Sequence, residues 1–170
     1  MVILVVIGIV PSFIVKNVVV NSYETRAVSI REVNLKNQCD ILGNQLMKEN
    51  YLREPDSDVI NGELSMLSAI YNGRILIINK DAKIIKDTYD IDVGKYALSE
   101  EVIQCFEGKS TANYDDKNAY IEMTSPITKM DSNTIEGVML VSISTSEIED
   151  SIDMLENRGN LLLSIICILV

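Results

Sequence analysis

The chain has 170 residues, 47% of them hydrophobic, and carries 15 basic against 25 acidic residues, a formal net charge of −10. It has three cysteines and no histidine. This excludes a disulfide-rich scaffold, catalytic triads that need histidine and the phosphorylated histidine of a kinase within this sequence. The excess of acidic residues also argues against nucleic-acid binding, which requires clustered Lys and Arg.

Both ends of the chain are apolar. Residues 1–15 contain no charged side chain, and residues 161–170 read LLLSIICILV. A membrane-spanning helix needs about 20 apolar residues, so we expect residues 1–20 to be the end of a truncated first transmembrane helix and residues 159–170 the truncated start of a second. The N-terminal run lacks the basic region and cleavage site of a secretory signal peptide. The alternative is that both runs pack into a soluble core.

Residues 21–158 form the predicted domain, and they begin with a helical pattern over residues 21–52. Leu35, Cys39, Leu42 and Leu46 make one apolar stripe on this helix. Val28, Leu35 and Leu42 are also seven residues apart, which hints at a coiled-coil seam between two copies, although the partner positions of the heptad are polar. The alternative is that the stripe packs on its own domain. No helix breaker separates this helix from the first span.

A loop, a short helix and a hairpin follow. Residues 53–62 contain Pro and Asn-Gly and predict the loop, and Gly73 suits the left-handed end of the short helix. The β-rich residues 74–79 and 84–85 predict two strands around a tight polar turn. Ser99 is then expected to cap another short helix.

The last third of the domain predicts three strands and a helix. Residues 110–114 and 119–127 form a hairpin, and residues 135–144 are apolar on both faces, as in a central strand. Ser146 and Glu149 form an S-x-x-E capping box for a final helix that continues into the apolar C-terminal run. This order favours an α+β fold in which a five-stranded antiparallel sheet is flanked by long N-terminal and C-terminal helices, both continuing into membrane spans.

No catalytic constellation is found in the sequence. Clustered carboxylates lie in predicted turns, where aspartate is ordinary turn chemistry, and their spacing matches no cation-binding loop: Asp87, Asp90, Asp92, Asp115 and Asp116. We therefore predict no catalytic residue, no metal ligand and no cofactor in this segment. Cys39 and Cys105 form the one candidate disulfide pair, and two buried free thiols are the alternative.

Four stretches resemble the extracytoplasmic PAS-like (single Cache) sensor domain of bacterial, clostridial-type membrane-bound sensor histidine kinases. They are NSYETRAVSIREVNLKNQCDILGNQL, YNGRILIINKDAKIIKDTYDIDVGK, SEEVIQCFEGK and GVMLVSISTSEIEDSIDMLE. The resemblance implies the input region of a two-component system, which passes a ligand- or partner-induced shift through the second span to a cytoplasmic kinase. ATP, Mg and a response regulator would act only on that kinase region, which lies outside this sequence.

The resemblance also implies a homodimer in the bacterial cell membrane with residues 21–158 extracellular. Two alternatives remain. The same sensor module occurs on chemoreceptors and cyclic-dinucleotide enzymes, and a non-signalling, membrane-anchored binding domain would share the same two apolar ends. The sequence does not select an amino acid, organic acid, peptide, metal ion or partner protein as the stimulus.

A small-ligand site on one face of the sheet is a further implication. Along residues 119–127, Ile121, Met123 and Ser125 suit packing against the long helix, and the alternate residues are polar, which fits a solvated face or the floor of a pocket. The ligand-binding candidates are Arg74, Tyr89, Tyr114, Tyr120, Glu122 and Thr124. Arg74 can pair with a ligand carboxylate, with a surface salt bridge as the alternative. The candidates for the dimer seam and signalling helices are Val28, Leu35, Leu42, Ile148, Ile152 and Leu155.

Overall fold

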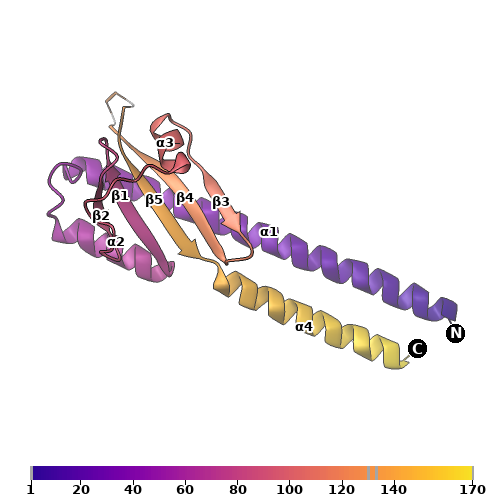
Figure 1. Ribbon diagram of the computed structural model, residues 1–170. Helices are drawn as coiled ribbons and strands as arrows, with labels where there is room; N and C mark the ends of the chain where they lie inside the picture. The colour runs from indigo at the N-terminus through magenta and orange to yellow at the C-terminus, as the bar shows by residue number, and fades with distance from the viewer. Residues whose placement is uncertain (1, 130, 133, 170) are drawn as a thin grey trace. The chain divides into compact units, whose positions relative to one another are not determined.

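The computed structural model describes residues 2–129, 131, 132 and 134–169, and for residues 2–9, 166 and 169 it describes the backbone alone. The helices are α1 (Val2–Lys48), α2 (Asp58–Ile70), α3 (Glu100–Phe106) and α4 (Ser146–Leu169) (Figure 1). The strands are β1 (Gly73–Asn79), β2 (Ile84–Asp87), β3 (Ala112–Asp115), β4 (Tyr120–Thr128) and β5 (Ile135–Ser144). The predicted α+β class and order of elements are confirmed.

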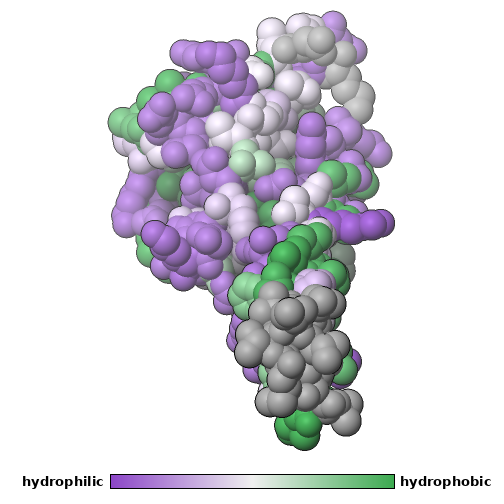
Figure 2. All heavy atoms as spheres, turned by 90° about the vertical axis from the view of Figure 1, so that its right-hand side faces the viewer, coloured by the Kyte–Doolittle hydropathy of each residue, from purple (hydrophilic) through white to green (hydrophobic). Residues whose placement is uncertain are grey.

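The chain divides into two compact units. Residues 1–31 and 145–170 form one, here called the helical unit, and residues 32–144 form the other, the sheet unit. Hydrophilic side chains cover most of the face of the sheet unit seen in Figure 2, whereas hydrophobic side chains gather on the helical unit. This face of the sheet unit therefore has the polar character that is typical of a surface in water.

The sheet is antiparallel throughout, with strand order β2-β1-β5-β4-β3. β5 has ten residues and lies at the centre, as its apolar residues on both faces predict. Gly73 of β1 lies opposite Ile143 of β5. A Cβ at Gly73 would lie 2.8 Å from the Cα of Ile143, so a side chain at this position would push the two strands apart.

One face of the sheet is covered by α2 and by the part of α1 that belongs to the sheet unit. Residues of β1, β4 and β5 that point to this face are almost fully buried: Ile75, Ile77, Ile121, Ile127, Met139, Val141 and Ile143. Leu35, Cys39, Leu42 and Leu46 of α1 are buried as well, and Figure 1 shows α1 and α2 along this side. Each such side chain contributes about 1.5–3 kcal/mol of burial free energy. The α1 stripe is therefore core of its own domain.

The opposite face is covered in part, by α3. A second apolar cluster forms there from Leu76, Ile78, Ile84, Val102, Cys105 and Val138. Cys39 lies on the α1 side of the sheet and Cys105 on the α3 side, and both are buried free thiols. Burial, with a smaller contribution from the charge of Asp40, raises the pKa of Cys39 to about 12. Cys39 and Cys105 are therefore two buried free thiols, and the candidate disulfide between them is not formed.

α1 runs without interruption for 47 residues and includes Pro11. It ends at Lys48, four residues before the predicted boundary, because Asn50 takes a left-handed conformation with φ 55° and Tyr51 turns into the core. In the described part of the chain, no helix combines the length and the apolar character that crossing a membrane requires. The assignment of residues 1–20 and 159–170 to truncated spans stays a prediction.

Within the helical unit, polar contacts join α1 and α4. Lys16 Nζ donates to Asn160 Oδ1 at 2.7 Å, and Arg31 Nη1 lies 3.3 Å from Glu147 Oε2. A Cβ at Gly159 would lie 2.9 Å from Lys16 Cγ, so this glycine permits the close approach of the two helices. α4 continues through Gly159, as predicted.

The predicted helix caps are confirmed only in part: Asn72, with φ 45°, takes the left-handed conformation after α2 in place of Gly73, which begins β1. α4 begins at Ser146, and the Glu149 N–H donates to the Thr145 carbonyl, so Thr145 occupies the cap position, one residue before the predicted one. Ser99 does occupy the cap position of α3, but its side chain makes no capping hydrogen bond there.

Candidate ligand-binding face of the sheet

Antiparallel pairing places partner residues side by side on the same face of a sheet. Ser142 of β5 pairs with Arg74 of β1 and with Glu122 of β4, and Tyr120 pairs with Ser144. These residues share the face that also carries α3. The Ser142 hydroxyl donates to Glu122 Oε2 at 3.1 Å. The polar face, as we call it, comprises Arg74, Tyr89, Tyr120, Glu122, Ser142 and Ser144.

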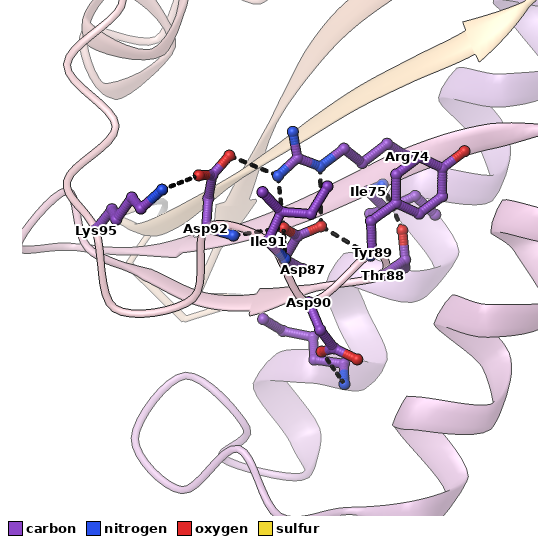
Figure 3. Close-up of polar contacts among 10 residues, drawn as sticks. Arg74, Ile75, Asp87, Thr88, Tyr89, Asp90, Ile91, Asp92 and Lys95 are labelled. Atoms are coloured by element: carbon purple, nitrogen blue, oxygen red, sulfur yellow. Dashed lines mark hydrogen bonds and ion pairs between the residues drawn. The ribbon is translucent and has the colours of Figure 1, made fainter.

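Arg74 is held by two carboxylates (Figure 3). Its Nε donates to Asp87 Oδ1 at 3.0 Å, and its Nη2 donates to Asp87 Oδ2 at 2.5 Å and to Asp92 Oδ2 at 2.6 Å. The Arg74 side chain is 27% exposed and that of Asp87 is fully buried. Hydrogen bonding to Asp87 is the main reason that the pKa of Arg74 is raised, although burial acts in the opposite direction. Arg74 therefore forms salt bridges with Asp87 and Asp92 of its own chain, which was the alternative to pairing with a ligand.

Asp87 also organises the loop that follows β2. Its Oδ1 accepts the N–H of Tyr89, and its Oδ2 accepts the N–H groups of Ile91 and Asp92, all at 2.9 Å. Burial acts to raise the pKa of Asp87, but the hydrogen bonds from Arg74 and these backbone groups outweigh it and hold the pKa well below the ordinary value. The predicted turn chemistry of Asp87 is confirmed.

The loop presents Tyr89 beside Arg74. The guanidinium carbon of Arg74 lies 6.0 Å from the centre of the Tyr89 ring, at the limit of a cation–π contact, and Tyr89 is 51% exposed. Nη1 of Arg74 points away from both aspartates in Figure 3 and makes no hydrogen bond within the described part of the chain. One edge of a fixed guanidinium is therefore open to an anionic group.

Two predicted ligand-binding residues lie elsewhere. Tyr114 pairs with Ile121 and therefore belongs to the opposite side of the edge strand β3. Thr124 shares the face of Glu122 but is buried, and its hydroxyl accepts the N–H of Thr111 at 3.0 Å and bonds to the Thr111 hydroxyl. Thr124 thus fastens the segment before β3 to β4. The structure brings together the other four candidates and adds Ser142, which the sequence analysis missed.

The residues predicted for a seam between two copies are turned inward. Val28, Leu35 and Leu42 are 7%, 0% and 4% exposed in the single chain. Ile148 of α4 is likewise buried, and Ile152 and Leu155 are half-buried. The heptad spacing at Val28, Leu35 and Leu42 therefore reflects packing inside the chain, and these side chains are not presented to a second copy.

Nothing in the described part of the chain gathers three or more carboxylate or cysteine side chains in an arrangement that would hold a metal ion. The carboxylates near Arg74 are neutralised by it and by Lys95, whose Nζ lies 2.6 Å from Asp92 Oδ1. The polar face is thus a surface for hydrogen bonds and ion pairs.

No protein-family model and no curated protein matches the sequence. Solved structures do match the fold. The sensor domain of the histidine kinase DctB from V. cholerae superimposes with a TM-score of 0.51 at 14% identity, over 79% of this chain and 59% of that one. The ligand-binding domain of the Campylobacter jejuni chemoreceptor Tlp3, in complex with 4-methylisoleucine, gives a TM-score of 0.52 at 14% identity, over 82% of this chain and 61% of that one.

A domain of a sensory box/GGDEF family protein from Vibrio parahaemolyticus gives a TM-score of 0.50 at 12% identity, over 74% of this chain and 57% of that one. The chain thus spans about three fifths of the length of these structures. At such identities the similarity concerns the fold alone: the chain has the PAS-like (Cache) fold of these sensor domains.

Proposed function

We propose that this chain is the signal-sensing region of a bacterial membrane protein, with the sheet unit outside the cytoplasm. The observation that carries the proposal is the way in which the sheet unit is inserted in the chain. The chain enters it along α1, whose residues 2–31 belong to the helical unit, and leaves it along α4, which lies wholly in that unit. Thr145 is the single residue between β5 and α4. A shift of β5 is therefore passed directly to the helix that leaves the domain.

The polar face is the proposed sensing site. Arg74 offers the open edge of its guanidinium, and Glu122 offers a carboxylate that otherwise receives one hydrogen bond, from Ser142. The three residues lie in one row across β1, β5 and β4. A small zwitterion such as an amino acid would place its carboxylate at Arg74 and its ammonium group at Glu122. β5 lies in the middle of this row, so a bound ligand would bear on the strand that leads to α4.

A cytoplasmic histidine kinase is the output that we propose, with ATP and Mg bound there and a response regulator as its partner. The kinase sensor domain of V. cholerae supports this choice, since its fold is shared. The chemoreceptor and GGDEF structures have the same fold, so a chemoreceptor or a cyclic-dinucleotide enzyme is the alternative output. The sensing role of the sheet unit is the same in each case.

A homodimer would use the side of α1 that remains exposed. Tyr23, Ile30, Val33 and Ile41 are each more than one third exposed, and their spacing of seven, three and eight residues keeps them on one side of the helix, away from the buried stripe. In place of the inward-turned residues, we propose this exposed stripe as the seam between two copies.

The sensing site is tested by thermal unfolding of the full chain in lipid nanodiscs with each of the 20 common L-amino acids. We expect at least one to raise the unfolding midpoint by a few degrees, because binding to the folded state stabilises it. Glu122→Gln should abolish that rise, and the exposed Glu54→Gln should leave it unchanged. If no amino acid shifts the midpoint, or if Glu122→Gln responds like the wild type, the polar face does not bind this class of ligand.

A further inference from the structure

A cleft of about 480 Å³ opens at the end of the sheet unit opposite to Ser144. Residues in or next to three turns line it: the α1–α2, β1–β2 and β4–β5 turns. Leu46, Met47 and Leu52 supply apolar surface, and polar and charged side chains supply the rest. The volume lies within the range of small-molecule sites.

Three cations line this cleft, one from each turn: Arg53, Lys80 and Lys129. None of the three makes an ion pair within the described part of the chain, although the chain contains 25 acidic residues. Asp81 and Glu136 also line the cleft, so its walls carry three positive and two negative charges. In a protein of net charge −10, this concentration of unpaired cations in a concave site attracts anions.

The turn that bears Arg53 is fixed before any ligand arrives. Tyr51 is fully buried, and its hydroxyl donates to Asn61 Oδ1 at 2.6 Å. The carbonyl of Asn50 accepts the N–H of Arg53 at 3.1 Å. Because the backbone on both sides of Leu52 is held, less conformational entropy is lost when Arg53 binds a ligand.

Hydrogen bonds also hold the backbone close to Lys80 and Lys129. Asn79 Oδ1 accepts the N–H groups of Asp81 and Lys83, at 3.1 and 3.0 Å. This fixes the amide so that its Nδ2 remains as a donor at the cleft. The Lys129 N–H donates to the Thr134 carbonyl at 2.9 Å, which holds the backbone of Lys129 next to β4. The cleft thus combines three cations with an amide donor, and backbone hydrogen bonds are formed close to each cation.

We propose that this cleft is a second binding site, for a small oxyanion that carries two or more negative charges. Charge-assisted hydrogen bonds from Arg53, Lys80 and Lys129 suit carboxylate and phosphate oxygens alike, and the volume admits a molecule of the size of citrate. The site shares no residue with the polar face and lies at the other end of the sheet. It therefore goes beyond the proposed sensing function and does not depend on it.

The test is isothermal titration calorimetry of the full chain in detergent micelles at low ionic strength. Citrate represents the carboxylate source and pyrophosphate the phosphate source, and we expect one of them to bind in a one-to-one ratio. Arg53→Gln and Lys80→Gln should each weaken binding about tenfold, as expected for the loss of one charge-assisted hydrogen bond. Lys117→Gln, in the exposed turn between β3 and β4, makes the same change of net charge away from the cleft and should have no effect.

A variant of opposite sign sharpens the test. Asp81→Asn removes a negative charge from the cleft wall and should tighten binding of the same anion severalfold. All the substituted side chains are exposed, so the thermal unfolding midpoints should stay at the wild-type value. Absence of binding by both anions would overturn the proposal, and so would an equal loss of affinity in Lys117→Gln, which would indicate general charge attraction.

Discussion

Asp87→Asn should destabilise the sheet unit far more than its conservative chemistry suggests. The buried carboxylate accepts five hydrogen bonds, two from Arg74 and three from backbone N–H groups. An asparagine presents an NH2 group in place of one oxygen, so at least the two donors at Oδ1 lose their acceptor. Each buried unpaired donor costs about 1–3 kcal/mol, and the Arg74 charge also loses its buried counter-charge. We expect a loss of about 3 kcal/mol in the free energy of unfolding.

The assay is urea unfolding of the full chain followed by circular dichroism, with Asp90→Asn as the matched control. Asp90 belongs to the same loop, is exposed and has a positive φ of 55°, a conformation that asparagine tolerates. Its nearest cation is Lys86 at 3.7 Å, so the change should stay within about 0.5 kcal/mol. If Asp87→Asn costs no more than Asp90→Asn, the loop is not organised by Asp87.

The pH dependence of the same pair gives a second readout. The pKa of Asp87 is lower in the folded than in the unfolded state, so the unfolded chain takes up the proton more readily. The stabilisation by Asp87 is complete above the unfolded pKa of about 3.9 and is lost as the pH falls below it. The stability difference between wild type and Asp87→Asn should therefore shrink in acid and stay constant from pH 5 to 7.

Two further predictions concern packing. Gly73→Ala should destabilise the domain by about 2–3 kcal/mol, because the new methyl group meets the β5 backbone. Gly62→Ala, in a helix with open space around it, should stabilise the domain by up to about 1 kcal/mol. Urea unfolding measures both, and equal effects of the two substitutions would contradict the pairing of Gly73 with Ile143. In a background with Cys167 replaced by Ser, Ile30→Cys should form a cross-linked dimer under mild oxidation and the inward-facing Val28→Cys should not. If Val28→Cys forms the dimer and Ile30→Cys does not, the seam between two copies lies along Val28, Leu35 and Leu42.

Much of the fold could be predicted because local pattern and global position agree. Residues 135–144 are apolar on both faces, and a strand of that kind is stable only between two neighbours, where the structure places it. The alternation of Ile121 and Met123 with polar residues likewise gave the correct buried side of β4. In both cases, burial is decided within a few consecutive residues.

The site was less predictable because it depends on register. Arg74 and Asp87 are brought together by the β1–β2 pairing, which contains an irregularity between Ile77 and Ile78 that sequence spacing does not reveal. Tyr114 falls on the other face because the turn after β3 sets which residues pair. The α1 stripe was ambiguous for another reason. An apolar repeat of three and four residues looks the same whether it packs on its own sheet or on a second copy.

The strand order has a consequence for synthesis. β5 is the last strand to leave the ribosome, yet it fills the gap between β1 and β4. Until it arrives, two seven- to nine-residue strands each present an unpaired inner edge, while the outer edges are covered by the four-residue strands β2 and β3. A nascent chain that stops before β5 would thus be prone to pair with another chain. The sheet is completed, and its inner edges are paired, just as α4 begins to emerge after β5.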